Sequence, residues 1–194
     1  VSTSLTPGNR SRRRSHDCWP ATDVNGAQLG LCAQPTPTCV RGIAISAASS
    51  GNDWSEDPPS QPGLAGFTAT SLVSISLLPP LVSFAIATSA SSWPAVSTAS
   101  SVVINFLSAD QHAIAGRFAT SGIDRFAEPT RWSRLPTGEP VLDDAPSFLR
   151  AQIAHRFAVG DHYLVVARLA THTERREHES LLYHDGRYAK AHHV

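Results

Sequence analysis

Short segments rich in β-branched and small apolar residues recur along this chain, separated by clusters of Pro, Gly, Asp and Ser. Segments of this composition and length are typical of β-strands bounded by turns. The predicted strands comprise residues 67–76, 81–88, 101–107, 149–159 and 162–170, with a final hairpin over residues 183–188, and residues 42–47 are a further short apolar run. Pro79-Pro80 predicts a rigid turn between two of them. Strands of this number and length, with one short helix, favour a closed β-barrel.

The segment over residues 149–159 has the clearest strand periodicity. Apolar and polar side chains alternate along it, which is typical of a strand with one buried face. The residues expected on the buried face are Leu149, Ala151, Ile153 and Phe157. The residues expected on the opposite face are Arg150, Gln152 and Arg156.

One helix is predicted to begin at Ser108. The Ser108 hydroxyl can accept a hydrogen bond from the Gln111 amide while the Gln111 side chain reaches back, which is the spacing of a capping box. The apolar face of this helix is expected to comprise Ala113, Ile114 and Phe118, with Ala115 and Arg117 pointing away.

The chain of 194 residues fits one domain with some surplus. Residues 1–40 are rich in Ser, Thr, Pro, Gly and Arg and lack helical or strand periodicity, so we expect a disordered tail there. Residues 41–190 are expected to form the barrel domain.

Charge and hydropathy exclude several classes of partner. Sixteen basic residues balance sixteen acidic ones, so no net field draws the protein to nucleic acid or to an anionic membrane. Prolines interrupt the longest apolar stretch, residues 77–87, well short of the roughly 20 residues that span a bilayer. Polar residues follow Arg12-Arg13-Arg14 where an export signal needs an apolar region. These features predict a soluble, cytoplasmic protein.

Neither cysteine nor histidine spacing predicts a metal site. Cys18, Cys32 and Cys39 lack the spacing of a zinc site, and free thiols in a reducing compartment are the expected state. The nine histidines are scattered, without the pair of a helical zinc site and its glutamate.

A series of short matches, each weak alone, occurs in a fixed order along the chain. Its members are residues 64–76, Pro79-Pro80-Leu81-Val82, residues 105–111, Phe118-Ala119, Asp124-Arg125-Phe126 and Gly160-Asp161-His162. Together they resemble the flavin reductase family. The resemblance implies a mainly β, Greek-key split barrel of the FMN-binding type, with one or a few short helices. It also implies a homodimer that passes hydride from NADH or NADPH to FMN or FAD and supplies reduced flavin to a partner monooxygenase.

The resemblance assigns the flavin ring to one Ser/Thr-rich segment. There, small side chains let the backbone approach the ring and hydroxyls donate hydrogen bonds. The corresponding residues are Thr68, Ala69, Thr70 and Ser71, with Ser74 nearby. An ordinary Ser/Thr-rich edge strand is the alternative interpretation.

The family's phosphate-binding turn corresponds to Ser89, Ser91 and Ser92. This chain departs from the family here, because no Lys or Arg occurs between Gly42 and Gly116. A flavin phosphate would therefore depend on hydroxyls, backbone amides and an arginine distant in sequence, such as Arg125. A solvated serine loop is the alternative.

Asn105 and Gln111 match the family's Asn-x-Leu-x-x-x-Gln pattern, which lies near the flavin. Capping of the helix is the alternative role for Gln111, and the two roles are compatible.

Gly160-Asp161-His162 resembles the family's nicotinamide-binding motif, in which the glycine shapes a turn and the histidine contacts the dinucleotide. This assigns His162 the catalytic position, although a lone histidine after a turn is often structural. Two departures are Ala167 in place of a usual glycine, and Ile153 or Ala154 in place of a frequent cysteine.

Two other functions remain open. One is a flavin-binding module without turnover, which the cation-poor phosphate region would fit. The other is a related split barrel that binds haem or a deazaflavin.

Overall fold

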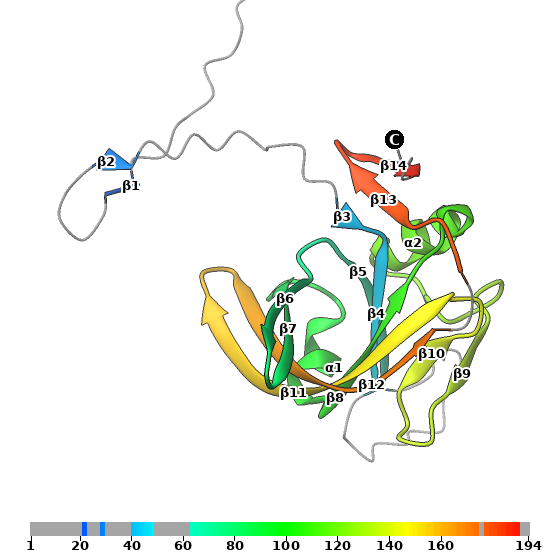
Figure 1. Cartoon of the computed structure of the whole chain (residues 1–194), viewed down its shortest axis with the longest axis horizontal. Coiled ribbons are helices and arrows are strands. Elements are labelled where there is room, and N and C mark those ends of the chain that lie inside the picture. Colours follow the sequence, from blue (N-terminus) through cyan, green and yellow to red (C-terminus); the bar gives the residue numbers. More distant parts are fainter. Residues whose placement is uncertain (1–20, 23–27, 30–39, 49–62, 175–176, 191–194) are drawn as a thin grey trace, which may run out of the picture. The chain divides into compact units, whose positions relative to one another are not determined.

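The structure, a computed structural model, describes residues 21–22, 28–29, 40–48, 63–174 and 177–190 (Figure 1). The chain forms two compact units, residues 1–37 and 38–194. In the first unit, strands β1 (Ala21–Thr22) and β2 (Gln28–Leu29) pair antiparallel. Most of the predicted tail, and residues 49–62, lie outside the described residues.

The second unit is built mainly from β-strands, as predicted. Its strands are β3 (Val40–Arg41), β4 (Ile43–Ala48), β5 (Leu64–Ala69), β6 (Val73–Leu77), β7 (Pro80–Ala87), β8 (Ser101–Phe106), β9 (Trp132–Arg134), β10 (Pro140–Leu142), β11 (Ser147–Val159), β12 (His162–Glu174), β13 (Leu181–His184) and β14 (Arg187–Lys190). Its helices are α1 (Trp93–Thr98) and α2 (His112–Ala119), the latter preceded by a 3₁₀ turn over Ala109–Gln111. No helix in the described part of the chain has the length and apolar character needed to cross a membrane.

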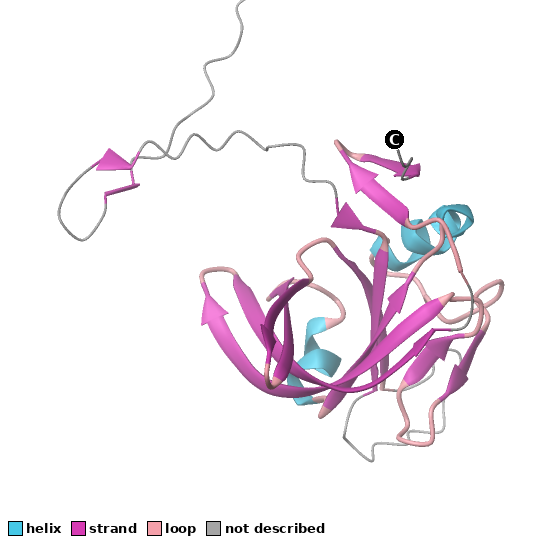
Figure 2. Ribbon diagram, in the orientation of Figure 1, coloured by secondary structure: helices cyan, strands magenta, loops and turns pink. Residues whose placement is uncertain are grey.

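Seven strands form one antiparallel sheet in the order β5-β4-β8-β11-β12-β7-β6. The sheet curls so far that its edge strand β5 approaches β7, where the Phe67 and Phe84 rings lie 5.9 Å apart between centroids. Figure 2 shows α1 within the curve of the strands, where Val96 is completely buried in the apolar core. The sheet and α1 thus enclose one hydrophobic interior.

The segment predicted as one strand over residues 67–76 is two strands in the structure. β5 ends at Ala69 and β6 begins at Val73, and the two lie at opposite edges of the sheet. The chain leaves one edge and joins the other because the sheet has curled round to meet itself. Ser71 lies at this seam, where its Oγ accepts a hydrogen bond from the Ala85 backbone N–H at 2.8 Å.

The buried face of α2 differs from the prediction. Ala115 and Phe118 are completely buried, whereas Ala113 is exposed. The 3₁₀ turn over 109–111 has three residues per turn, so it changes the phase in which the α-helix begins. The predicted capping box of Ser108 and Gln111 is present, and in its reach-back half the Ser108 backbone N–H donates to Gln111 Oε1 at 3.0 Å.

A register shift in β11 reverses the predicted faces of that strand only beyond Ile153. Leu149, Ala151 and Ile153 pack in the core as expected, but the pairing with β12 shifts between Ile153 and His155. An extra residue in one strand reverses the alternation beyond it. Phe157 is therefore 51% exposed.

The same shift directs Arg156 toward α1. Its Nη2 donates to the Val96 carbonyl at 2.9 Å and also to the Ala99 carbonyl, so it satisfies carbonyls at the end of the helix. Burial lowers the pKa of Arg156. The C-terminal end of α1 is thereby fastened to β11.

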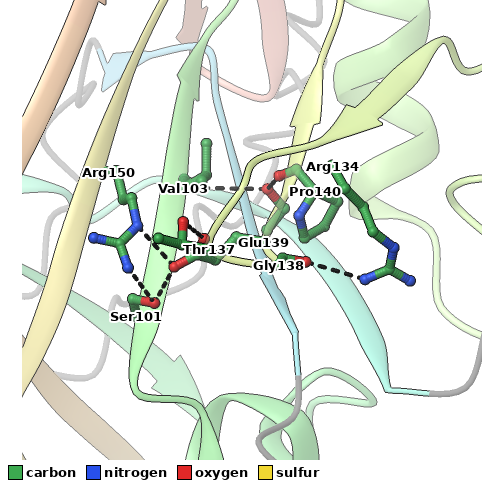
Figure 3. A network of polar contacts seen from close by, with 9 residues as sticks. Ser101, Val103, Arg134, Thr137, Gly138, Glu139, Pro140 and Arg150 are labelled. Atoms are coloured by element: carbon green, nitrogen blue, oxygen red, sulfur yellow. Dashed lines mark hydrogen bonds and ion pairs between the residues drawn. The ribbon is translucent and has the colours of Figure 1, made fainter.

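The β9–β10 hairpin, which the sequence analysis did not predict, is anchored by a buried carboxylate. Glu139 is 2% exposed and accepts hydrogen bonds from Arg150, Ser101 and Thr137 (Figure 3). The Arg150 Nε lies 2.8 Å from Glu139 Oε1. Burial by itself raises the pKa of Glu139, but these hydrogen bonds outweigh it and lower the pKa to about 2.

The C-terminal hairpin agrees with the prediction. β13 and β14 pair around Asp185-Gly186, and both turn residues have positive φ, 49° and 75°. β13 also pairs with β3, and the Gly42 N–H donates to the Leu181 carbonyl at 2.7 Å. Val40 and Arg41 are therefore joined to the C-terminal hairpin through β13.

Candidate functional site

Two neighbouring cavities lie beside β5 and the loop before α1, and the first of them also borders β7. The first, which we call the seam cavity, has a volume of about 190 Å³. It is lined by Phe67, Thr68, Ala85, Ile86, Ala87, Ala90, Ser91, Ser92, Phe118, Ala119, Ser121 and Arg125. The second, which we call the loop cavity, has a volume of about 330 Å³. It is lined by Leu64, Ala65, Gly66, Ser91, Ser92, Gly122, Ile123, Asp124, Arg125 and Phe126.

Ser91, Ser92 and Arg125 line both cavities. Ser91 is exposed, whereas Ser92 is buried and donates from its Oγ to the Gly66 carbonyl at 2.9 Å. This bond fixes the loop before α1 against β5. Ser89 is exposed in the same loop but lines neither cavity.

Arg125 brings a positive charge to the loop of Ser91 and Ser92, which lies in the part of the sequence between Gly42 and Gly116 that contains no Lys or Arg. Its Nε donates to the Phe118 carbonyl at 3.1 Å, and its Nη2 donates to Ser91 Oγ at 3.2 Å. Burial lowers the pKa of Arg125, which still leaves an arginine protonated near neutral pH. It is the only basic residue among the described residues that line either cavity.

A second arginine supports the backbone on which Arg125 stands. Arg117, from α2, donates to the Asp124 carbonyl at 2.7 Å and to the Arg125 carbonyl at 3.3 Å. Asp124 Oδ1 in turn accepts from the Phe126 backbone N–H at 2.9 Å. The loop is thus held by its own hydrogen bonds, and its cation is positioned before any ligand arrives.

The residues predicted to lie along the flavin ring have different environments in the structure, and they do not all line one cavity. Thr68 lines the seam cavity and donates to the Ala115 carbonyl at 2.7 Å. Ala69 is buried in the core, Ser71 bridges the seam, and Thr70 and Ser74 are exposed. Only Thr68 therefore lines a cavity, while Thr70 and Ser71 lie at the open seam beside it.

Asn105 and Gln111 lie away from both cavities. Asn105 is completely buried, donates to the Ala44 carbonyl at 3.1 Å, and accepts from the Leu142 N–H at 3.1 Å. Gln111 is 9% exposed and engaged with Ser108. In this structure both side chains serve the fold, Asn105 by tying β10 to the sheet and Gln111 by starting the helix.

His162 lies at the tip of the long β11–β12 hairpin. Gly160 has a φ of +60°, which permits the tight turn, and His162 pairs with Ala87 of β7. His162 Nδ1 lies 2.7 Å from Asp161 Oδ1, and this contact with the histidine lowers the pKa of Asp161. The Thr88 N–H donates to the Asp161 carbonyl at 2.9 Å. The turn bearing His162 is therefore bound directly to the loop that carries Ser89, Ser91 and Ser92.

Several residues around the cavities were not identified from the sequence. Gly66, Phe118 and the loop from Gly122 to Asp124 all line one of them. The close match around Asp124-Arg125-Phe126 was a signal for this loop. The sequence around Gly66 does not indicate its role, because that role depends on the packing of α2, which lies about 50 residues later in the chain.

Comparison with known proteins decides the family. The flavin reductase like domain matches residues 39–192. This chain belongs to that family. An NADH:FMN oxidoreductase of Rhodococcus erythropolis is 40% identical over 167 residues, which cover 82% of each chain. A reductase subunit of a flavin-dependent monooxygenase from Rhodococcus jostii is 30% identical over 123 residues, 63% of each chain.

A solved structure supports the same architecture. A flavin reductase domain protein from Arthrobacter sp. FB24 superposes with a TM-score of 0.69 at 29% identity, covering 81% of this chain and 91% of that one. The predicted split-barrel fold of the flavin reductase family is thereby confirmed.

Proposed function

We propose that this protein is an NAD(P)H-dependent flavin reductase that supplies reduced FMN or FAD to a partner monooxygenase. The observation that carries the proposal is the meeting of Arg125 and Ser91 at an open seam of the family's fold. A cation and hydroxyls in a partly enclosed cleft suit the phosphate of a flavin. The relatives named above are an NADH:FMN oxidoreductase and a monooxygenase reductase subunit.

The reaction requires the protein chiefly to bind the nicotinamide and the flavin and to orient them toward each other. The nicotinamide supplies a hydride and the flavin accepts it, so the chain needs no strong acid or base. We assign Arg125 and Ser91 to the flavin phosphate, while Ser92, whose Oγ donates to the Gly66 carbonyl, holds the loop beside it. Thr68, Thr70 and Ser71 then border the ring, where the seam between β5 and β7 lies open.

We assign His162 to the nicotinamide nucleotide. Its turn is hydrogen-bonded through Asp161 to Thr88, three residues before Ser91. This continuity supports a single cleft in which donor and acceptor lie close together, as a direct hydride transfer requires.

We also propose that the protein is a homodimer and that the β11–β12 hairpin contributes to its interface. Phe157, Val159 and Leu164 are 51%, 58% and 37% exposed on this hairpin. Phe157 and Leu164 are direct cross-strand partners, so they form one apolar surface. Exposed apolar patches of this kind mark protein contacts. Sedimentation velocity should show a dimer for the wild type and a monomer for Phe157→Glu with Leu164→Glu.

The cytoplasmic location predicted from the sequence would suit this function, since NAD(P)H must reach the enzyme. The partner would then be an oxygenase that takes up reduced flavin, in line with the named activity of the Rhodococcus jostii relative.

Stopped-flow and steady-state assays test the function directly. Purified protein with FMN or FAD should oxidise NADH or NADPH and bleach the flavin absorbance under anaerobic conditions. Flavin binding without NAD(P)H oxidation would support the non-catalytic module instead. A Soret band or a deazaflavin spectrum in the purified protein would point to the other split-barrel function.

A further inference from the structure

The loop cavity continues beyond the residues assigned to the phosphate. It shares Ser91, Ser92 and Arg125 with the seam cavity, and from there it extends over the start of β5 and the loop from Gly122 to Phe126. The seam cavity extends instead along β7. The shared residues are therefore a junction from which two cavities run over different elements.

The loop cavity is the larger of the two, about 330 Å³ against about 190 Å³. If the flavin ring lies toward β7 and its phosphate lies at Arg125, an FMN molecule ends at this junction. The loop cavity would then begin where FMN ends. In FAD, the second phosphate and the adenosine continue from the same point.

The lining of the loop cavity suits an adenosine group. Leu64, Ile123 and Phe126 offer apolar surface for a flat base, and Gly122, where an added Cβ would meet nothing within 4 Å, leaves the backbone open to close approach. Asp124 lies on the same wall, where a carboxylate can accept from ribose hydroxyls or from the adenine amino group. Ligand cavities commonly combine apolar walls with a few polar groups in this way.

Charge alone would not distinguish the two flavins. The phosphate of FMN and the diphosphate of FAD each bring close to two negative charges, and Arg125 faces either one. The contacts beyond Arg125 would decide the preference, and the Arg117 hydrogen bonds hold that loop in place without a ligand.

From this arrangement, and resting on the proposed function, we infer that the loop cavity takes the adenylate half of FAD. The protein is then an FAD-preferring reductase. The adenylate half of NADH shares the same chemistry, so the experiment must separate the two dinucleotides.

Binding titrations of riboflavin, FMN and FAD, followed by flavin fluorescence, test the inference without turnover. FAD should bind about tenfold more tightly than FMN. Adenosine, which lacks a phosphate, should displace FAD and leave FMN bound. Ile123→Trp fills the loop cavity and should weaken FAD binding about tenfold relative to FMN.

Ile75→Trp is the matched control, because Ile75 is 49% exposed and Ile123 is 42% exposed, and Ile75 lines neither cavity. It should leave the ratio of the FAD and FMN dissociation constants unchanged. Melting curves establish whether both variants fold. If Ile123→Trp does not fold, adenosine competition with the wild-type protein still tests the inference.

The contrary results are distinct. Equal affinity for FMN and FAD, with no competition by adenosine, overturns the inference and leaves the reductase function standing. Displacement of NADH by adenosine, or a raised KM for NADH in Ile123→Trp with FAD binding unchanged, assigns the cavity to the nicotinamide dinucleotide. Failure to bind any flavin overturns the proposed function as well.

Discussion

A methyl group added to Gly66 would lie 2.5 Å from the Cε1 atom of Phe118. Gly66 is in β5 and Phe118 is in α2, and the Gly66 carbonyl accepts the hydrogen bond that holds Ser92. The close packing of α2 against β5 at Gly66 thus occurs at a residue that also supports the junction of the two cavities.

Gly66→Ala should therefore destabilise the protein by about 1–3 kcal/mol, because the buried Phe118 ring must move. Flavin affinity should fall as the Ser92 loop shifts. Thermal melting and flavin titration measure the two effects. Gly116→Ala is the control: a Cβ there meets nothing within 4 Å, and alanine favours a helix, so stability should be unchanged or slightly higher. Equal effects of the two substitutions would contradict the packing argument.

Arg125→Ala should weaken FMN binding by about 10- to 100-fold, since a hydrogen bond to a charged group contributes roughly 1.5–3 kcal/mol. Riboflavin has no phosphate, so its affinity should change little. Isothermal titration with both ligands measures the difference. Arg131→Ala removes an exposed arginine paired with Asp144 and serves as the control. A parallel loss of FMN and riboflavin affinity would show that Arg125 does not contact the phosphate.

His162→Ala should raise the KM for NAD(P)H and change flavin affinity little, because we place His162 on the nicotinamide side of the cleft. A residue that binds ground and transition states alike lowers kcat/KM more than kcat. His172→Ala, an exposed histidine farther along β12, is the matched control. Loss of flavin binding in His162→Ala would show instead that the histidine maintains the turn.

Glu139 should make the protein sensitive to acid. Its pKa in the folded state is about 2, below the 4.5 of an unperturbed glutamate, so its stabilising contribution is complete above pH 4.5 and is lost as the pH falls toward 2. This contribution is at most roughly 3 kcal/mol. Urea unfolding between pH 2.5 and pH 6 should show a flatter pH dependence for Glu139→Gln than for the wild type. Asp144→Asn, at an exposed ion pair, should retain the wild-type profile.

Removal of residues 1–37 should leave the melting temperature and flavin binding unchanged, because they form a separate compact unit. Removal of residues 1–42 should lower the melting temperature. It deletes β3 and the Gly42 hydrogen bond to Leu181, and thus part of the backbone contacts that hold β13. Equal melting temperatures for the two truncations would show that β3 contributes nothing to stability.

Local composition was sufficient to predict most strands and the Asp185-Gly186 turn, and the ordered series of short matches indicated the family. It could not predict the reversal of faces in β11, because the extra residue near Ala154 has no sequence signature and sends Phe157 outward and Arg156 inward. Helix α1 was missed, although Pro94 near its start fits a first helical turn. For the site, the match to Asp124-Arg125-Phe126 indicated the arginine. Its meeting with Ser91, 34 residues away, depends on the curl of the sheet.

The two hydrogen-bonded connections on either side of α1 have a consequence for hydride transfer. Arg156 ties the end of the helix to β11, and Thr88 ties the preceding loop to the turn of Asp161. The hairpin that carries His162 and the loop that carries Ser91 are therefore held in a fixed arrangement by these hydrogen bonds. The spacing between a donor held by one and an acceptor held by the other is set during folding, so neither ligand has to supply the free energy of aligning them.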